Sequence, residues 1–183
     1  MRHNVLRDVE AALLTKVCTD VKVEPSLLPT DEERTAGNTA LGARLDISAR
    51  GIWSRCEKTF MDVRVTHPTS QSHLRKSMET LYRENEREKK NLYNDRIINT
   101  ERGTFTPLVF STTGGMAPEC ARLNRRVAEL IAAKTGEAYH EVSANTPQIR
   151  SPALHSDSSS RNEREDARQR RDGCGRGFIQ PHS

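Results

Sequence analysis

The sequence predicts an α/β fold in which a mixed β-sheet is flanked by helices and followed by a disordered C-terminal tail. Two neighbouring segments alternate apolar and polar residues, as the two strands of a hairpin do. A third strand segment comes only after a long helical segment, and parallel strands are commonly joined by such a helix. A hairpin joined to a strand of this kind makes a mixed sheet, whose apolar faces must be covered by helices.

The N-terminal part of the chain predicts one helix and one short strand. Apolar residues follow helical spacing over residues 4–18, with charged residues between them. Val21 and Val23 then allow a short strand, which Pro25 and Pro29 stop.

The hairpin follows a polar segment, residues 30–41, which predicts a loop. Residues 43–48 and 59–66 are the two alternating strands, and Gly51 lies in the turn between them. Alternation places the residues of the second strand on two faces: Met61, Val63 and Val65 on one, and Phe60, Asp62 and Arg64 on the other.

The remaining elements complete the order helix, strand, strand, strand, helix, strand, helix. They are a long helix over 72–99 closed by Gly103, a strand over 105–111 with an exit turn at 112–115, and a helix over 119–134 ended by Gly136.

The chain divides by composition into a domain over residues 1–145 and a basic, Ser-rich tail over residues 146–183. Residues 148–183 contain only four strongly apolar residues, Ile149, Leu154, Phe178 and Ile179. A segment of this composition cannot bury enough apolar surface to fold, so we expect disorder there.

Composition excludes several classes of protein. No apolar run approaches the roughly 18 residues that a membrane span needs. Asp8 and Glu10 interrupt the stretch in which a signal peptide would be apolar, so we expect an intracellular protein that is not secreted. The four cysteines form no CxxC pair, which argues against a zinc module. Aromatic residues are only 4% of the chain, too few for a base-stacking platform.

Two aspartates on the hairpin form the most informative pattern. Asp46 and Asp62 each lie between apolar neighbours, so both should project from the opposite sheet face and meet there. Two carboxylates a few ångströms apart suit Mg²⁺ (or Mn²⁺), and Arg64 on the same face would stabilise charge on a phosphate. A salt bridge from Asp62 to Arg44 or to Arg64 explains the same pattern without a metal.

A series of motifs extends this pattern over residues 2–142. It comprises RHNVLRD, VCTDVKVEPSLLP, ARLDISARGIW, KTFMDVRVTHP, YRENEREKKNLYNDRIINTERGTFTPLVFSTTGGMAPE and RVAELIAAKTGE. The series resembles the restriction-endonuclease-like domain of site-specific non-LTR retrotransposon polyproteins, which belongs to the PD-(D/E)XK nuclease superfamily.

The resemblance implies a restriction-endonuclease-like core and a metal-dependent DNA endonuclease that hydrolyses phosphodiester bonds. Asp46 corresponds to the first metal-binding acid and Asp62 to the acid of the (D/E)XK element. Glu10 matches the acid of the first helix, although a solvated helix charge is an equal interpretation. The family context adds DNA as substrate, the parent polyprotein's reverse transcriptase as partner, and the nucleus as location.

The sequence departs from the family pattern at Arg64, in the missing Cys/His knuckle and in the tail, and these three departures keep other functions open. Arg64 stands where the pattern calls for Lys, and arginine cannot act as a general base. Lys89 or Lys90 on the long helix would be a substitute, unless they belong to a solvated face with a Glu86–Lys90 pair.

The Cys/His knuckle that precedes this domain in the family is missing, and the tail resembles nothing in the family, so we expect an excised or decayed fragment. The alternatives to an active nuclease are an inactive descendant that binds nucleic acid or a protein, and a fragment without a selected role.

Overall fold

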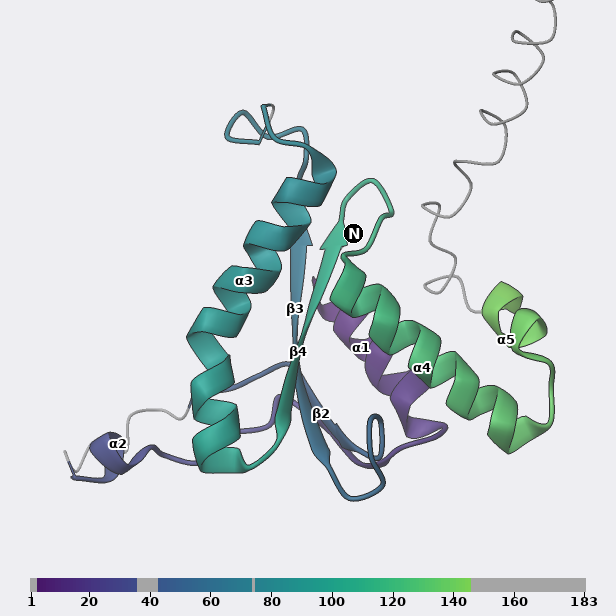
Figure 1. Ribbon diagram of the computed structural model, residues 1–183, viewed down its shortest axis with the longest axis horizontal. Helices are drawn as coiled ribbons and strands as arrows, with labels where there is room; N and C mark the ends of the chain where they lie inside the picture. Colours follow the sequence, from purple (N-terminus) through teal and green to yellow (C-terminus); the bar gives the residue numbers. More distant parts are fainter. Residues whose placement is uncertain (1–2, 36–42, 74, 146–183) are drawn as a thin grey trace, which may run out of the picture. The chain divides into compact units, whose positions relative to one another are not determined.

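The computed structural model describes residues 3–35, 43–73 and 75–145, which form a mixed β-sheet with helices on both faces (Figure 1). In chain order the elements are α1 (His3–Thr15), β1 (Thr19–Val23), α2 (Asp31–Thr35), β2 (Ile47–Arg50), β3 (Lys58–Thr66), α3 (Met78–Arg96), the π-helical turn η1 (Ile97–Glu101), β4 (Thr104–Ser111), α4 (Pro118–Thr135) and α5 (Tyr139–Asn145). The tail predicted over 146–183 lies outside the described residues. No helix of the described residues is long and apolar enough to cross a membrane.

The four strands lie in the order β1-β2-β3-β4, which confirms the predicted mixed sheet. β2 pairs antiparallel with β1 and with β3, and Ile47 lies opposite Met61 in the hairpin. β3 and β4 pair in parallel along their full length because α3 carries the chain back to the start of the sheet.

The larger core lies between the sheet and the helices α1 and α4, which cover one face (Figure 1). Met61 and Val63 of β3 point into it, as their alternation predicts. Leu6 and Leu14 of α1 and Val127 of α4 pack there with at most 2% of their surface exposed. This apolar layer stabilises the sheet by removing its inner face from water.

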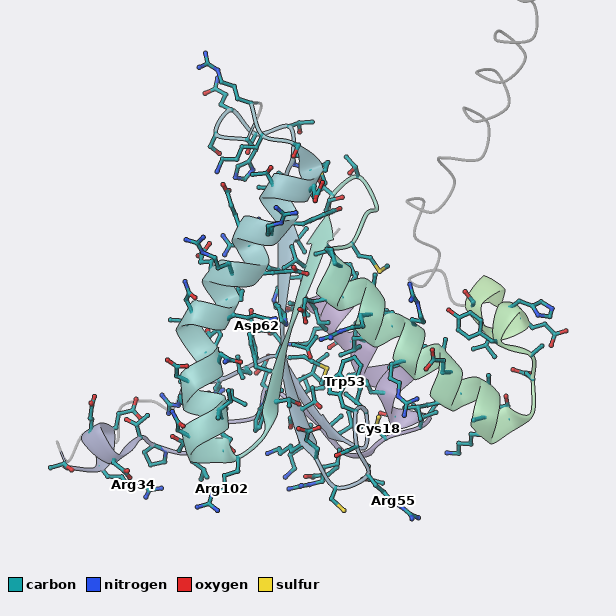
Figure 2. All side chains as sticks on the ribbon, in the orientation of Figure 1. Cys18, Arg34, Trp53, Arg55, Asp62 and Arg102 are labelled. Atoms are coloured by element: carbon teal, nitrogen blue, oxygen red, sulfur yellow. The ribbon has the colours of Figure 1, made fainter. Side chains whose placement is uncertain are left out.

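The opposite face, under α3, has a much smaller apolar cluster. Its buried members are Leu27, Leu45, Phe60, Ile97 and Phe105. The central part of this face carries polar side chains instead, and Figure 2 shows Asp62 between α3 and the strands while Arg34, Arg55 and Arg102 project outward. A polar centre between a helix and a sheet is unusual for a layer that serves packing alone.

Several boundaries differ from those predicted. The first hairpin strand begins only at Ile47, because residues 43–46 form a bend with an isolated bridge to Ser26. The long helix begins at Met78, since the Ser77 hydroxyl accepts a hydrogen bond from the Thr80 backbone N–H and caps it there. The segment predicted as a loop, residues 30–41, contains α2, and its residues 36–41 lie outside the described residues. The helix α5 was not predicted.

Gly103 does not close the long helix as predicted. That helix continues through η1, and Arg102 takes the left-handed conformation at its end with φ 52°. Gly136 does end α4, with φ 76°, as predicted.

Candidate functional site

Asp62 lies at the centre of β3 on the face that α3 covers, and only 7% of its surface is exposed. It projects there because its neighbours Met61 and Val63 point into the larger core. Burial raises the pKa of the Asp62 carboxyl, Lys89 lowers this pKa in part, and the nearby carboxylate of Asp46 raises it further. Asp46 is therefore near enough to Asp62 to act on its pKa.

Lys89 of α3 is the partner of Asp62. Its Nζ lies 2.5 Å from Oδ2 of Asp62, and 18% of its side chain is exposed. The ammonium also lies 5.7 Å from the ring centre of Tyr93, one turn further along the helix. In the described part of the chain Oδ2 has no other donor, and Oδ1 of Asp62 accepts no hydrogen bond.

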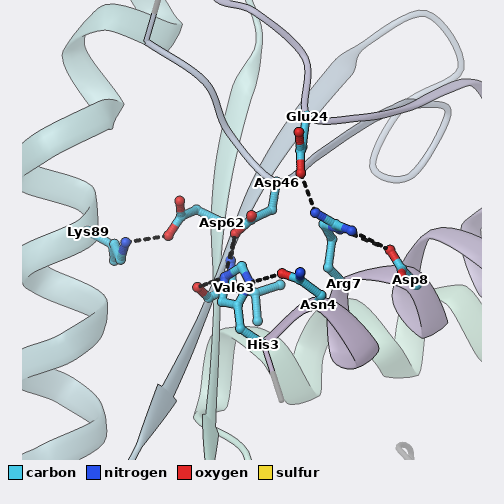
Figure 3. A network of polar contacts seen from close by, with 9 residues as sticks. All are labelled: His3, Asn4, Arg7, Asp8, Glu24, Asp46, Asp62, Val63 and Lys89. Atoms are coloured by element: carbon cyan, nitrogen blue, oxygen red, sulfur yellow. Dashed lines mark hydrogen bonds and ion pairs between the residues drawn. The ribbon is translucent and has the colours of Figure 1, made fainter.

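Asp46 lies in the bend directly before β2, not within the strand. Its backbone N–H donates to Met61 (3.2 Å) and its carbonyl accepts from the Glu24 N–H (2.9 Å), which fixes the bend against β3. Its side-chain Oδ2 accepts a hydrogen bond from the Val63 N–H at 2.7 Å and lies 3.1 Å from Nε2 of His3 (Figure 3). Among the described residues Oδ1 of Asp46 has no partner, so one oxygen of each aspartate is available.

Arg64 does not pair with Asp62. It projects from β3 on the same side of the sheet, but its guanidinium lies 2.9 Å from Glu88 of α3. No described contact joins Asp62 to Arg44 either, so both predicted salt bridges of Asp62 are wrong. The predicted Glu86–Lys90 pair is also absent, because Lys90 lies 2.8 Å from Glu119 of α4.

Glu10 is not brought to Asp46 and Asp62. Its side chain lies on the other side of the sheet, with none of its surface exposed, among the helices of the larger core. Its Oε1 accepts a hydrogen bond from the amide of Asn124 on α4 at 3.2 Å. Burial raises the pKa of Glu10 to about 7. The interpretation as a solvated helix charge is therefore wrong.

The residues of this site fit a divalent cation with oxygen ligands. The donor set is the free Oδ1 of Asp46 and the free Oδ1 of Asp62, and Mg²⁺ commonly uses one or two carboxylates and takes its other ligands from water and phosphate. The described residues contain no group of three or more His, Cys, Asp or Glu side chains arranged to hold a metal.

Sequence reasoning missed His3 and Glu88, which contact the predicted site residues. It named Lys89 only as one of two alternatives. The signal that separates Lys89 from Lys90 is helical spacing, because Lys89 lies one turn after Asn85 and two turns before Ile97, and both of these are buried.

A scan against models of known protein families finds no match for this chain, and a search of curated proteins finds none that is significantly similar.

Proposed function

We propose that this chain is a metal-dependent DNA endonuclease-type domain of retrotransposon origin with a restriction-endonuclease-like core. The observation that carries the proposal is the buried Asp62–Lys89 pair between β3 and α3, with the carboxylate of Asp46 near enough to raise the pKa of Asp62. Two acids from a hairpin and a lysine are the residue types that the PD-(D/E)XK pattern combines. The order of helices and strands, with a parallel strand reached through α3, supports the same core.

Asp46 and Asp62 would hold Mg²⁺ or Mn²⁺ through their free Oδ1 atoms. The other oxygen of each carboxylate already has a partner in the protein, which restricts rotation of both groups. When bound, the ion would polarise the phosphate and lower the pKa of a water molecule.

Lys89 would supply the lysine function that Arg64 cannot. Its ammonium holds a proton beside Asp62, and from there it can donate a hydrogen bond to a phosphate oxygen on which negative charge develops. We assign Arg64 and its partner Glu88 to the rim of the site, where Arg64 would hold charge next to the DNA backbone.

The wider context of the proposal comes from the resemblance. DNA would be the substrate, the parent polyprotein's reverse transcriptase the partner, and the nucleus the location. Charge supports a nucleic-acid substrate only weakly, since the net charge is +4.

A second candidate function is an inactive descendant that binds nucleic acid or a protein through the same fold. The Asp62–Lys89 pair itself favours it, because an ion pair already neutralises the buried carboxylate without a metal. Such a protein would keep Asp62 and Lys89 for stability alone.

Nicking of supercoiled plasmid by the full chain in Mg²⁺ or Mn²⁺ separates these functions. We expect metal-dependent nicking by the wild type and its loss in Asp46→Asn, Asp62→Asn and Lys89→Met. Asp95→Asn, the same chemical change on an exposed residue of α3, should nick like the wild type. A folded wild type that nicks in neither metal would support the inactive descendant, and nicking that persists in Asp62→Asn would overturn the assignment of the site.

A further inference from the structure

His3, the first residue of α1, joins three segments that are far apart in the chain. Its Nε2 lies 2.9 Å from the backbone oxygen of Val63 on β3 and 3.1 Å from Oδ2 of Asp46 in the bend before β2 (Figure 3). The imidazole thus lies where the first helix, the bend and the central strand meet.

These contacts determine which ring nitrogen of His3 carries hydrogen. A backbone carbonyl oxygen and a carboxylate oxygen can only accept, so Nε2 must be the donor to both. The other ring nitrogen, Nδ1, lies 3.3 Å from the side-chain amide of Asn4, and this amide can supply a donor if its oxygen and nitrogen are exchanged.

Asp46 is held through a single oxygen as a result. Its Oδ2 accepts from the Val63 N–H at 2.7 Å and from Nε2–H of His3, whereas its Oδ1 has no partner among the described residues. Because two donors bind Oδ2, the carboxylate of Asp46 cannot rotate freely. Its Oδ1 therefore keeps one orientation and remains available to a ligand. Outer partners of this kind orient ligating carboxylates in metal sites, and their loss typically lowers metal affinity by 10–100-fold.

We propose that His3 is a positioning residue, whose Nε2–H holds Oδ2 of Asp46 so that Oδ1 is presented to a divalent cation. The proposal rests on the metal-dependent function proposed above. His3 itself is not a ligand in this arrangement, because its Nε2 lone pair is replaced by the hydrogen that it donates. Its contribution to metal binding is made entirely through Asp46.

The test compares two substitutions of nearly equal length in the full chain. In His3→Gln the terminal amide can place an N–H close to the position of Nε2, whereas the side chain of His3→Met has no donor. Mn²⁺ binding is measured from the electron paramagnetic resonance signal of the free ion, and circular dichroism checks that each variant is folded. We expect about 10–100-fold weaker Mn²⁺ binding in His3→Met, and recovery of most of the affinity in His3→Gln.

The outcomes distinguish this inference from the proposed function. A wild type that does not bind Mn²⁺, or that binds it no better than Asp62→Asn, would overturn the proposed metal site. If the wild type binds and Asp62→Asn does not, equal affinity in the wild type and His3→Met would overturn the role of His3 alone. Equal weakening in His3→Gln and His3→Met would also overturn it, because the donor would then not be what matters. A structural tether would change unfolding in both variants without a difference between them in Mn²⁺ affinity.

Discussion

Lys89 of α3 and Asp62 of β3 form an ion pair in the space between helix and sheet, with Nζ 2.5 Å from Oδ2 and only 18% and 10% of the side chains exposed. A pair at this depth has lost most of its hydration, and each charge depends on the other for compensation. This one contact can therefore stabilise the fold, hold the lysine at the metal site, or do both. Substitutions at the two positions separate these roles.

Removing one partner should cost far more stability than removing both. Lys89→Met leaves the buried carboxylate of Asp62 without its cation, and we expect the free energy of unfolding to fall by about 3 kcal/mol. The double variant Asp62→Asn, Lys89→Met should recover most of this loss. Urea denaturation of the wild type, Lys89→Met, Asp62→Asn and the double variant measures the coupling energy between the two residues. In the matched control Arg83→Met, which breaks an exposed pair with Glu79, the change should stay below about 0.5 kcal/mol. Additive losses from the two single substitutions would contradict the pairing.

Lys89 should also oppose metal binding, since its ammonium and a divalent cation compete for the same carboxylate. For a Kd of about 1 mM, 10 mM Mg²⁺ would stabilise the wild type by about 1.4 kcal/mol, a rise of a few degrees in Tm. We expect a larger rise in Lys89→Met and none in Asp62→Asn, while Asp95→Asn responds like the wild type. A Tm that is insensitive to Mg²⁺ in the wild type and in Lys89→Met would argue against the metal site.

The hairpin and the parallel strand could be predicted because alternation and apolar content are local properties. Met61 and Val63 on one face and Asp62 on the other follow from a period of two alone. In polar segments the pattern of apolar residues does not determine where a helix begins. The sequence predicts that the long helix begins at residue 72. In the structure it begins at Met78, because the hydroxyl of Ser77 caps it there.

The candidate site could be predicted as far as the two aspartates. Lys89 could also have been chosen over Lys90 from the sequence. Residues of α3 and the first residue of η1 face the sheet at intervals of four: Leu81, Asn85, Lys89, Tyr93 and Ile97. Glu10 carries the same signal, because it lies four residues from both Leu6 and Leu14 in the apolar stripe of α1. The sequence gives no such signal for His3, because its contacts depend on how α1 crosses the sheet.

Gly103, directly before β4, allows the chain to pass close to β3. A Cβ at this position would lie 2.5 Å from the backbone oxygen of Lys58 on β3, and a backbone atom in a paired strand cannot move aside. We expect Gly103→Ala to lower the free energy of unfolding by about 2–3 kcal/mol. Gly114→Ala is the matched control: a Cβ there meets no described atom within 4 Å, so only its φ of +92° costs energy, about 1 kcal/mol. Thermal denaturation compares the two, and equal losses would contradict the close-approach explanation.

Glu10 should make the stability of the domain depend on pH. Its carboxyl is fully buried beside Asn124, and both Oε2 of Glu10 and Oδ1 of Asn124 lack a hydrogen-bond partner in the described part of the chain. Burial raises the pKa of Glu10 from 4.5 to about 7. The protonated form avoids a buried charge and offers a hydrogen that the amide oxygen can accept.

The sign of the effect follows from the direction of this shift. The folded state binds the Glu10 proton more tightly than the unfolded state, so its contribution is fully present below about pH 4.5 and is lost as the pH rises through about 7. The loss of stability should be about 3.5 kcal/mol, at about 1.4 kcal/mol for each of the 2.5 pH units between the two pKa values. Glu10→Gln keeps the shape without the charge, so we expect it to match the wild type near pH 5 and to exceed its free energy of unfolding at pH 8. Glu84→Gln, an exposed change of the same kind on α3, controls for altered net charge. Urea denaturation at both pH values measures the four differences, and a Glu10→Gln variant whose advantage is the same at pH 5 and pH 8 would show that Glu10 is not held as the neutral acid.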